Sequence, residues 1–204
     1  MEKIIHNVGN MVDIPNDSSI ALHNKENNII FLGKMSYEPN IVAVTYFSSQ
    51  IFPKLKEIFP DLSFTIIGAN PDERVRKLTE SCGIFVTGFV DSVEPFFQQS
   101  TIVVAPMLTG AGIQNKIIQA MSYGCCVATS TIGAEGLSIT NDEIAIYNND
   151  SEWVYGLQQL LTNRNIRKEM GTRAREYVKN NLAREIIAEQ FWKFIDYPLT
   201  NNHK

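Results

Sequence analysis

The sequence lacks the features that mark several large classes of protein. Cys82, Cys125 and Cys126 are its only cysteines, and they have neither metal-ligand spacing nor the even number that a disulfide framework requires. No apolar run approaches the roughly 20 residues of a membrane-spanning helix, and residues 1–7 contain no long apolar signal core. With 18 basic against 22 acidic residues, the chain has no positive excess that would attract nucleic acid. We therefore expect a cytoplasmic protein with no metal site, no transmembrane segment and no nucleic-acid partner.

The order of the hydrophobic segments predicts an α/β fold. The chain has 204 residues, of which 44% are hydrophobic, enough for one globular domain. Short runs rich in β-branched residues alternate with helix-length amphipathic segments, the pattern of a parallel sheet flanked by helices. Residues 102–105 are nearly all apolar, which predicts a central strand covered on both faces. The predicted strands are residues 29–32, 64–67, 84–86, 102–105, 125–129 and 144–147.

The helices are predicted from amphipathic periodicity and from capping residues. Pro53 predicts a kink or a restart in the first helix. Gly124 is expected to end the helix 113–123, and Ser151 is a candidate N-cap for a long helical C-terminal region. The predicted helices are residues 39–58, 72–81, 93–99 and 113–123, followed by the helical region 151–196.

The strongest candidate site is the glycine turn Gly110-Ala111-Gly112, which follows the fourth predicted strand and opens a helix. In open α/β sheets ligands bind beyond the carboxyl ends of the strands. A turn with little side-chain bulk exposes backbone N–H groups, and the start of a helix favours an anion. Asn115, Lys116 and Gln119 follow within the helix, so Lys116 can add a charge and Gln119 can share its face. These features predict a site for the diphosphate of a nucleotide-type ligand.

Two further loops follow predicted strands. Gly33 and Lys34 follow the first, and Gly88 and Phe89 follow the third, where the aromatic ring could lie against a flat base. Each feature also has an ordinary explanation: an unliganded tight turn, a solvated Lys34, a surface Gln119 or a core Phe89. Cys125 and Cys126 are predicted to be core residues. Glu135 could cap a turn or approach a ligand, and the turn is favoured.

Four segments, in this order and at these spacings, resemble the C-terminal half of a family 4 glycosyltransferase with the GT-B fold. They are Phe31-Leu32-Gly33-Lys34, residues 86–91, residues 110–121 and Gly133-Ala134-Glu135-Gly136-Leu137. The resemblance covers residues 28–196, and residues 4–13 resemble a degraded form of the segment between the two halves of such enzymes. It implies a linker or partial interdomain segment over 1–28, a Rossmann-like donor domain over 29–182, and a C-terminal helix and tail over 183–204.

The resemblance also implies a function. The position of Lys34 and the glycine-turn helix would hold the diphosphate of a nucleotide-sugar donor, and the position of Gln119 would face the ribose. The donor is a substrate, so no separate cofactor is implied. The acceptor would bind to a missing N-terminal half, supplied in cis or in trans, which could bring the protein to the inner face of the membrane. The expected activity is that of a retaining glycosyltransferase in polysaccharide or glycoconjugate synthesis, absent from the chain in isolation. The alternatives are a non-catalytic nucleotide-sugar-binding or regulatory module and, less favoured, a GT-B epimerase.

The sequence departs from the family pattern at three positions. Many members carry two glutamates where this chain has Ala111 and Gln119, and a second phosphate-binding lysine where it has Asn40. Gln119 can still accept a hydrogen bond from a ribose hydroxyl but lacks the charge that strengthens it. We expect weaker donor binding at that position, and we expect Lys116 to supply the charge that Asn40 does not.

Overall fold

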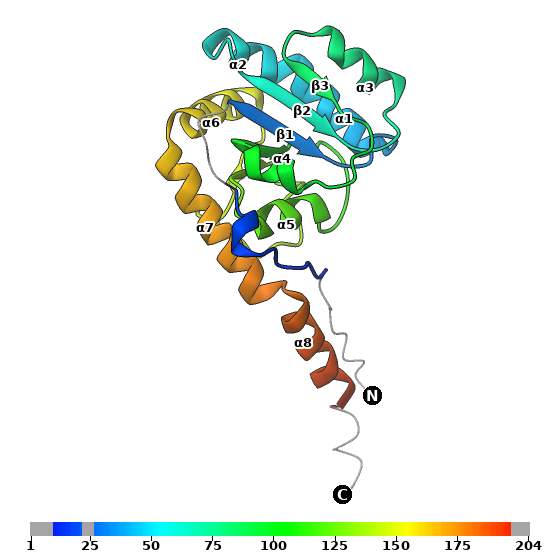
Figure 1. Ribbon diagram of the computed structural model, residues 1–204, viewed down its shortest axis with the longest axis vertical. Helices are drawn as coiled ribbons and strands as arrows, with labels where there is room; N and C mark the ends of the chain where they lie inside the picture. The colour runs from blue at the N-terminus through cyan, green and yellow to red at the C-terminus, as the bar shows by residue number, and fades with distance from the viewer. Residues whose placement is uncertain (1–9, 22–26, 197–204) are drawn as a thin grey trace, which may run out of the picture.

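The computed structural model describes residues 10–21 and 27–196, coloured in Figure 1. Residues 4–9 of the predicted interdomain segment and residues 197–204 of the predicted tail lie outside the described residues.

A six-stranded parallel sheet forms the centre of the molecule, which confirms the predicted Rossmann-like α/β fold. Its strand order is β3-β2-β1-β4-β5-β6, and every neighbouring pair is parallel. The connections run from β1 outward to β2 and β3, and from β4 outward in the other direction to β5 and β6. The strands are β1 (Asn28–Leu32), β2 (Ser63–Ile67), β3 (Ile84–Val86), β4 (Ile102–Ala105), β5 (Val127–Thr129) and β6 (Ala145–Ile146).

The two central strands are buried on both faces. All four residues of β4 are buried, as are Ile29, Ile30 and Phe31 of β1. Ile29 aligns with Phe64 on one side and with Ile102 on the other. β4 is therefore central, as its apolar sequence predicts, and helices on both faces of the sheet exclude water from it.

The helices pack around the sheet and against one another. Helix α5 packs against β4, β5 and α7, while α6 packs against α2 and α7. Figure 1 shows α7 and α8 running down from the body of the molecule as a long helical extension. The helices are α1 (Glu38–Tyr46), α2 (Phe52–Ile58), α3 (Glu73–Lys77), α4 (Glu94–Gln99), α5 (Asn115–Ser122), α6 (Asp150–Thr162), α7 (Arg164–Asn181) and α8 (Arg184–Asp196), with short turns η1 (Asp17–Ser19), η2 (Phe47–Ile51) and η3 (Leu78–Glu80).

The predicted helix over 39–58 is interrupted, and the interruption precedes Pro53. Between α1 and α2 the turn η2 is a π-helix, in which the N–H of Phe52 donates to the carbonyl of Phe47, five residues back. Pro53 then lies in the first turn of α2, where its missing N–H breaks no helical hydrogen bond. The helix therefore restarts at Pro53 as expected, directly after the wider π-helical turn η2.

The predicted N-cap Ser151 is wrong by two residues. Helix α6 is capped by Asn149, whose Oδ1 accepts a hydrogen bond from the N–H of Glu152 at 3.0 Å. The Glu152 carboxylate in turn accepts from the N–H of Asn148 at 2.7 Å. This reciprocal arrangement satisfies backbone donors that Ser151 could not reach from inside the helix.

The predicted helical region 151–196 consists of three helices, α6, α7 and α8. Asn163 ends α6 and caps α7, because its Oδ1 accepts from the N–H groups of Asn165 and Ile166. Residues 10–21 then lie against α7 and the start of α8: the N–H of Val12 donates to the carbonyl of Leu182 at 3.0 Å, and Arg184 pairs with Asp13.

The cysteines behave as predicted. Cys125 and Cys126 are buried, whereas Cys82 is exposed. Burial raises the pKa of both Cys125 and Cys126 to about 12, so neither is a thiolate at neutral pH. They are core residues rather than nucleophiles.

Candidate functional site

A hollow lies at the carboxyl edge of the sheet, between the loops that follow β1 and β4. These adjacent strands are where the direction of the crossovers reverses, the usual place for a ligand in a sheet of this kind. The hollow has a volume of about 370 Å³. Its walls come from the end of β1, the start of α1 and the start of α5. The lining residues are Leu32, Gly33, Lys34, Tyr37, Asn40, Ile113, Gln114, Asn115, Lys116 and Gln119.

Helix α5 places Lys116 against the hollow. Ile117, Ile118, Ala120 and Met121 of this helix are buried, so its apolar stripe is anchored in the core. Asn115, Lys116 and Gln119 of the same helix line the hollow. Lys116 is consequently the second residue of a well-anchored helix, close to the end where backbone N–H groups are free to bind an anion.

Lys116 is a partly buried cation whose recorded contacts include no carboxylate. Its Nζ donates to Oδ1 of Asn40, lies 3.5 Å from the Met107 sulfur and stands 4.7 Å from the centroid of the Phe31 ring. Loss of solvation lowers the pKa of Lys116 to about 8. At neutral pH the lysine is mostly charged while facing weak dipoles and a ring, and an anionic ligand would supply the missing counter-charge.

Asn40 joins the two sides of the hollow. Its Nδ2 donates to the carbonyl of Lys34 at 3.0 Å, while its Oδ1 accepts from Lys116. A side chain at position 33 would meet Asn40 Nδ2 at 2.6 Å, so glycine there allows this close approach. The amide therefore fixes both the loop after β1 and the lysine of α5 while adding no charge of its own.

Backbone contacts tie the next two loops to this edge. The N–H of Gly33 donates to the carbonyl of Ile67 at 3.0 Å, and the N–H of Gly68 donates to the carbonyl of Gly88 at 3.2 Å. Phe89 projects outward with 75% of its surface exposed, so it is not the core residue that its apolar side chain also suggests. Gly88 and Phe89 lie on the loop beyond Gly68 and do not line the hollow.

The structure thus divides the predicted donor-binding residues into groups. Gly33, Lys34, Asn115, Lys116 and Gln119 line one hollow. The glycine turn, residues 110–112, is exposed and leads into the hollow without lining it. Tyr37 and Gln114 also line the hollow, although neither is among the predicted binding residues. Each directly precedes a helix that follows a strand, and Gln114 lies within the family-like segment 110–121.

The glycine turn already binds a carboxylate of this chain. The N–H of Gly112 donates to Oε2 of Glu135 at 3.1 Å, and Gln114 Nε2 donates to the carbonyl of Gly112 at 3.2 Å. Glu135 lies in a turn after β5, as predicted, with its own N–H bonded to the carbonyl of Ile132. Its side chain reaches across to the loop after β4, which the sequence does not reveal.

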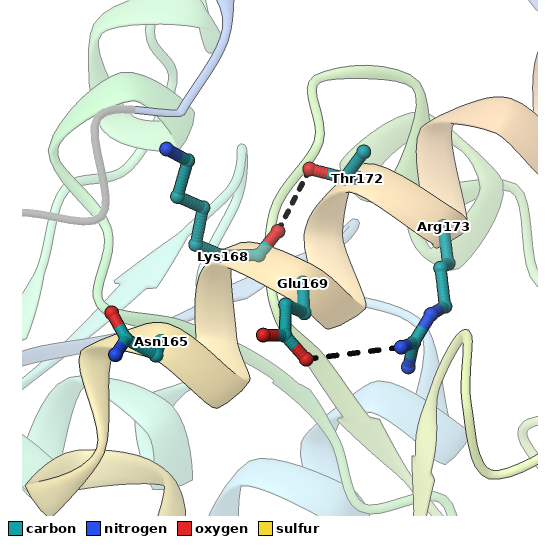
Figure 2. Close-up of a pocket in the computed structure, with 5 residues that line it drawn as sticks. All are labelled: Asn165, Lys168, Glu169, Thr172 and Arg173. Carbon is teal, nitrogen blue, oxygen red and sulfur yellow. Dashed lines mark hydrogen bonds and ion pairs between the residues drawn. The ribbon is translucent and has the colours of Figure 1, made fainter.

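A second hollow, on the surface of α7, lacks these properties (Figure 2). All five of its lining residues come from one helix: Asn165, Lys168, Glu169, Thr172 and Arg173. The closest charged pair in it is Glu169 with Arg173 at 3.7 Å, and the Thr172 hydroxyl donates to the carbonyl of Lys168. This hollow lies between exposed side chains of a single helix, and none of its lining residues follows a strand, so we assign no ligand to it.

Residues 10–21 and 27–196 contain neither a helix that could span a membrane nor a cluster of metal-binding side chains. None of the helices there combines the length and the apolar character needed to cross a bilayer. Within the same residues, His, Cys, Asp and Glu nowhere gather in a group of three or more that could hold a metal ion.

Comparison with known proteins identifies the family. Residues 26–163, more than half of the chain, match the family described as Glycosyl transferases group 1. The chain belongs to the group 1 glycosyltransferases. An uncharacterized 44.6 kDa protein in the cps region of Klebsiella pneumoniae is 22% identical over 182 residues, 84% of this chain and 46% of that protein.

Several solved structures have the same fold. TarM matches with a TM-score of 0.75 at 19% identity, covering 90% of this chain and 37% of TarM. Anabaena HepE in complex with UDP and glucose matches with a TM-score of 0.72 at 12% identity, over 92% of this chain and 55% of HepE. The C-terminal domain of a glycosyl transferase group 1 family protein, LpcC from Francisella tularensis, matches at a TM-score of 0.66 and 15% identity, over 85% of this chain and 99% of that domain. The chain thus spans about half or less of the longer proteins it matches.

Proposed function

We propose that this chain is the donor-binding half of a retaining glycosyltransferase that uses a nucleoside diphosphate sugar. The observation that carries the proposal is Lys116, a cation facing the hollow at the reversal point of the sheet with no carboxylate among its recorded contacts. Membership of the group 1 family supports glycosyl transfer, and HepE, of the same fold, was solved with UDP and glucose.

The diphosphate would lie between the Gly33-Lys34 loop and the start of α5. One phosphate charge at 4 Å from Lys116 would gain about 4 kcal/mol of Coulomb energy at an effective dielectric near 20, before desolvation is subtracted. Lys34, exposed on the opposite wall, would add a second positive charge. Gln119, one helical turn beyond Asn115, would face the ribose.

The proposal includes a role in polysaccharide or glycoconjugate synthesis, which the relative in the cps region supports. It also includes a separate acceptor-binding half, in cis or in trans. A cleft between two halves positions an acceptor and excludes water, so the chain alone is expected to bind the donor without transferring its sugar.

The proposed function predicts that the purified chain binds UDP more tightly than uridine. Lys116 and Lys34 contact only the phosphates in this arrangement, so the diphosphate should add at least tenfold to the affinity, since hydrogen bonds to charged groups contribute about 1.5–3 kcal/mol. Calorimetry with UDP, GDP and their nucleosides measures the difference. Equal affinity for nucleoside and diphosphate, or no binding of any of them at millimolar concentration, would contradict the assignment.

Diphosphate binding should also weaken above pH 8. Lys116 has a pKa of about 8 in the empty hollow, and a bound diphosphate raises this pKa because it favours the charged lysine. Below pH 8 the lysine is charged in both states, so affinity is constant. Above pH 8 the free protein loses a proton that the complex retains, and affinity should fall by up to about tenfold per pH unit.

Titrations with UDP between pH 7.5 and 9.5 measure this fall, in a range where the phosphates themselves no longer titrate. Lys116→Arg is the control, because an arginine stays charged throughout this range and should give a flat profile. A fall of the same size in Lys116→Arg would assign the pH dependence to another group.

A further inference from the structure

Glu135 holds a carboxylate at the end of the hollow where the glycine turn lies. Its Oε2 accepts from the N–H of Gly112 at 3.1 Å, and no hydrogen bond to its Oε1 is recorded within the described part of the chain. The loops after β4 and β5 are closely packed here, because a Cβ at Gly136 would approach Ile113 to 2.8 Å. One oxygen of the carboxylate is therefore fixed by the backbone, and the other is free to accept a hydrogen bond from a ligand.

The position of this carboxylate gives the site a polarity. Among residues 10–21 and 27–196, no aspartate or glutamate lines the hollow, so its inner part, around Lys116, is positive. Glu135, at the glycine turn, is negative and would repel a phosphate placed there. A hydroxyl group is favoured instead, because a carboxylate only accepts hydrogen bonds and binds O–H donors strongly.

The order of groups along α5 suggests which part of the donor reaches Glu135. Gln119 lies one turn further into the helix than Asn115 and Lys116. Gly112 lies before the first residue of the helix, and its N–H holds the Glu135 carboxylate at that end. With the ribose at Gln119 and the diphosphate at Lys116, the group left beside the glycine turn is the sugar. Ala111 has no polar group to bind it, and the amide Nε2 of Gln114 already donates to the carbonyl of Gly112 at 3.2 Å.

The geometry points to Glu135 as the residue that binds the hydroxyls of the donor sugar and fixes the direction in which the donor lies. This inference rests on the proposed function, since it requires a diphosphate at Lys116. It assigns Gly112 a supporting part: its N–H orients the carboxylate rather than binding a phosphate.

The test measures UDP and UDP-glucose affinity by calorimetry for the chain and for Glu135→Gln. The glutamine can still accept from Gly112 but has lost its charge, so UDP should bind equally well or up to several-fold more tightly. The ratio of UDP-glucose affinity to UDP affinity should fall about tenfold, the effect expected from losing a hydrogen bond to a charged group. Glu169→Gln, the same change on the exposed face of α7, is the matched control and should alter neither value.

The outcomes separate the possible roles. If Glu135 only braces the loop, Glu135→Gln will leave both affinities unchanged while Glu135→Ala weakens UDP and UDP-glucose alike, and the inference is overturned. A ratio of UDP-glucose to UDP affinity that stays within twofold of the parent also overturns it. Failure of the parent chain to bind UDP overturns the use of a uridine donor at this site, and the sugar contact with it. A parent chain that binds UDP and shows an unchanged ratio in Glu135→Gln removes the Glu135 inference alone.

Discussion

A Lys116→Met variant should lose most of its affinity for nucleoside diphosphates and yet be more stable than the parent chain. The lysine supplies the charge of the hollow, so its loss should weaken UDP binding about 10- to 100-fold, the range expected for a hydrogen bond to a charged group. Methionine has similar length and no charge, and it would pack against Phe31 and Met107, which already surround the lysine nitrogen.

The gain in stability follows from the pKa. Desolvation lowers the pKa of Lys116 to about 8, so at pH 7 the folded protein carries a cation that would be better solvated in the unfolded chain. Removing it should raise the free energy of unfolding by about 1–3 kcal/mol. The loss of the hydrogen bond that Asn40 Oδ1 accepts from Lys116 reduces this gain. The gain should shrink as the pH rises from 8 toward 10.5, because the parent lysine then becomes neutral in the fold.

Calorimetry and thermal unfolding measure both effects on the same preparation. Lys168→Met, which removes an exposed lysine from α7, is the control and should leave UDP affinity unchanged. Unchanged UDP affinity in Lys116→Met would show that Lys116 only covers the core and does not bind the diphosphate.

Replacing Gly68 with alanine should destabilise the fold more than any other small change at this edge of the sheet. Gly68 follows β2 with φ +157°, and a Cβ there would stand 1.7 Å from the carbonyl oxygen of Gly33. Both atoms belong to a backbone or are attached directly to one, so one strand end must move. We expect a loss of about 3 kcal/mol or more, combining overpacking with backbone strain.

The displaced loop also carries Lys34, so UDP affinity should fall with stability. Urea unfolding followed by the fluorescence of the buried Trp153 measures the loss. Gly88→Ala is the matched control: its φ of +73° disfavours alanine, but no atom lies within 4 Å of the new Cβ, so only about 1–2 kcal/mol should be lost. Equal losses in the two variants would show that backbone strain, and not the contact with Gly33, makes Gly68 necessary.

Most of the fold could be predicted because local patterns agree with the final packing. The predicted strands 84–86 and 102–105 coincide with β3 and β4, and the others differ from the observed strands at their ends. The misplaced N-cap had a different cause. Both Ser151 and Asn149 are good caps, and the choice depended on Glu152 reaching back to Asn148, a reciprocal contact that propensity alone does not rank.

The candidate site was predicted less completely, because its parts come from distant segments. Lys116 and Gln119 could be placed from the helix that follows the glycine turn. The contact of Lys116 with Asn40 joins residues 76 positions apart, and that of Gly112 with Glu135 joins residues 23 apart. Such contacts depend on how far each loop extends beyond the sheet, and no periodicity in the sequence records that distance.

The neutrality of Asn40 has a consequence for how this site can evolve. An asparagine codon becomes an aspartate codon by a single base change, and the two side chains have nearly the same shape. An aspartate at this position would give Lys116 an internal partner, so the hollow would no longer need an anion from outside. It would also lose the hydrogen bond that Asn40 Nδ2 donates to the carbonyl of Lys34 at 3.0 Å, because a carboxylate only accepts hydrogen bonds. Lineages that depend on donor binding should therefore resist this substitution strongly, whereas lineages that have lost the activity should accept it at only the cost of that one hydrogen bond.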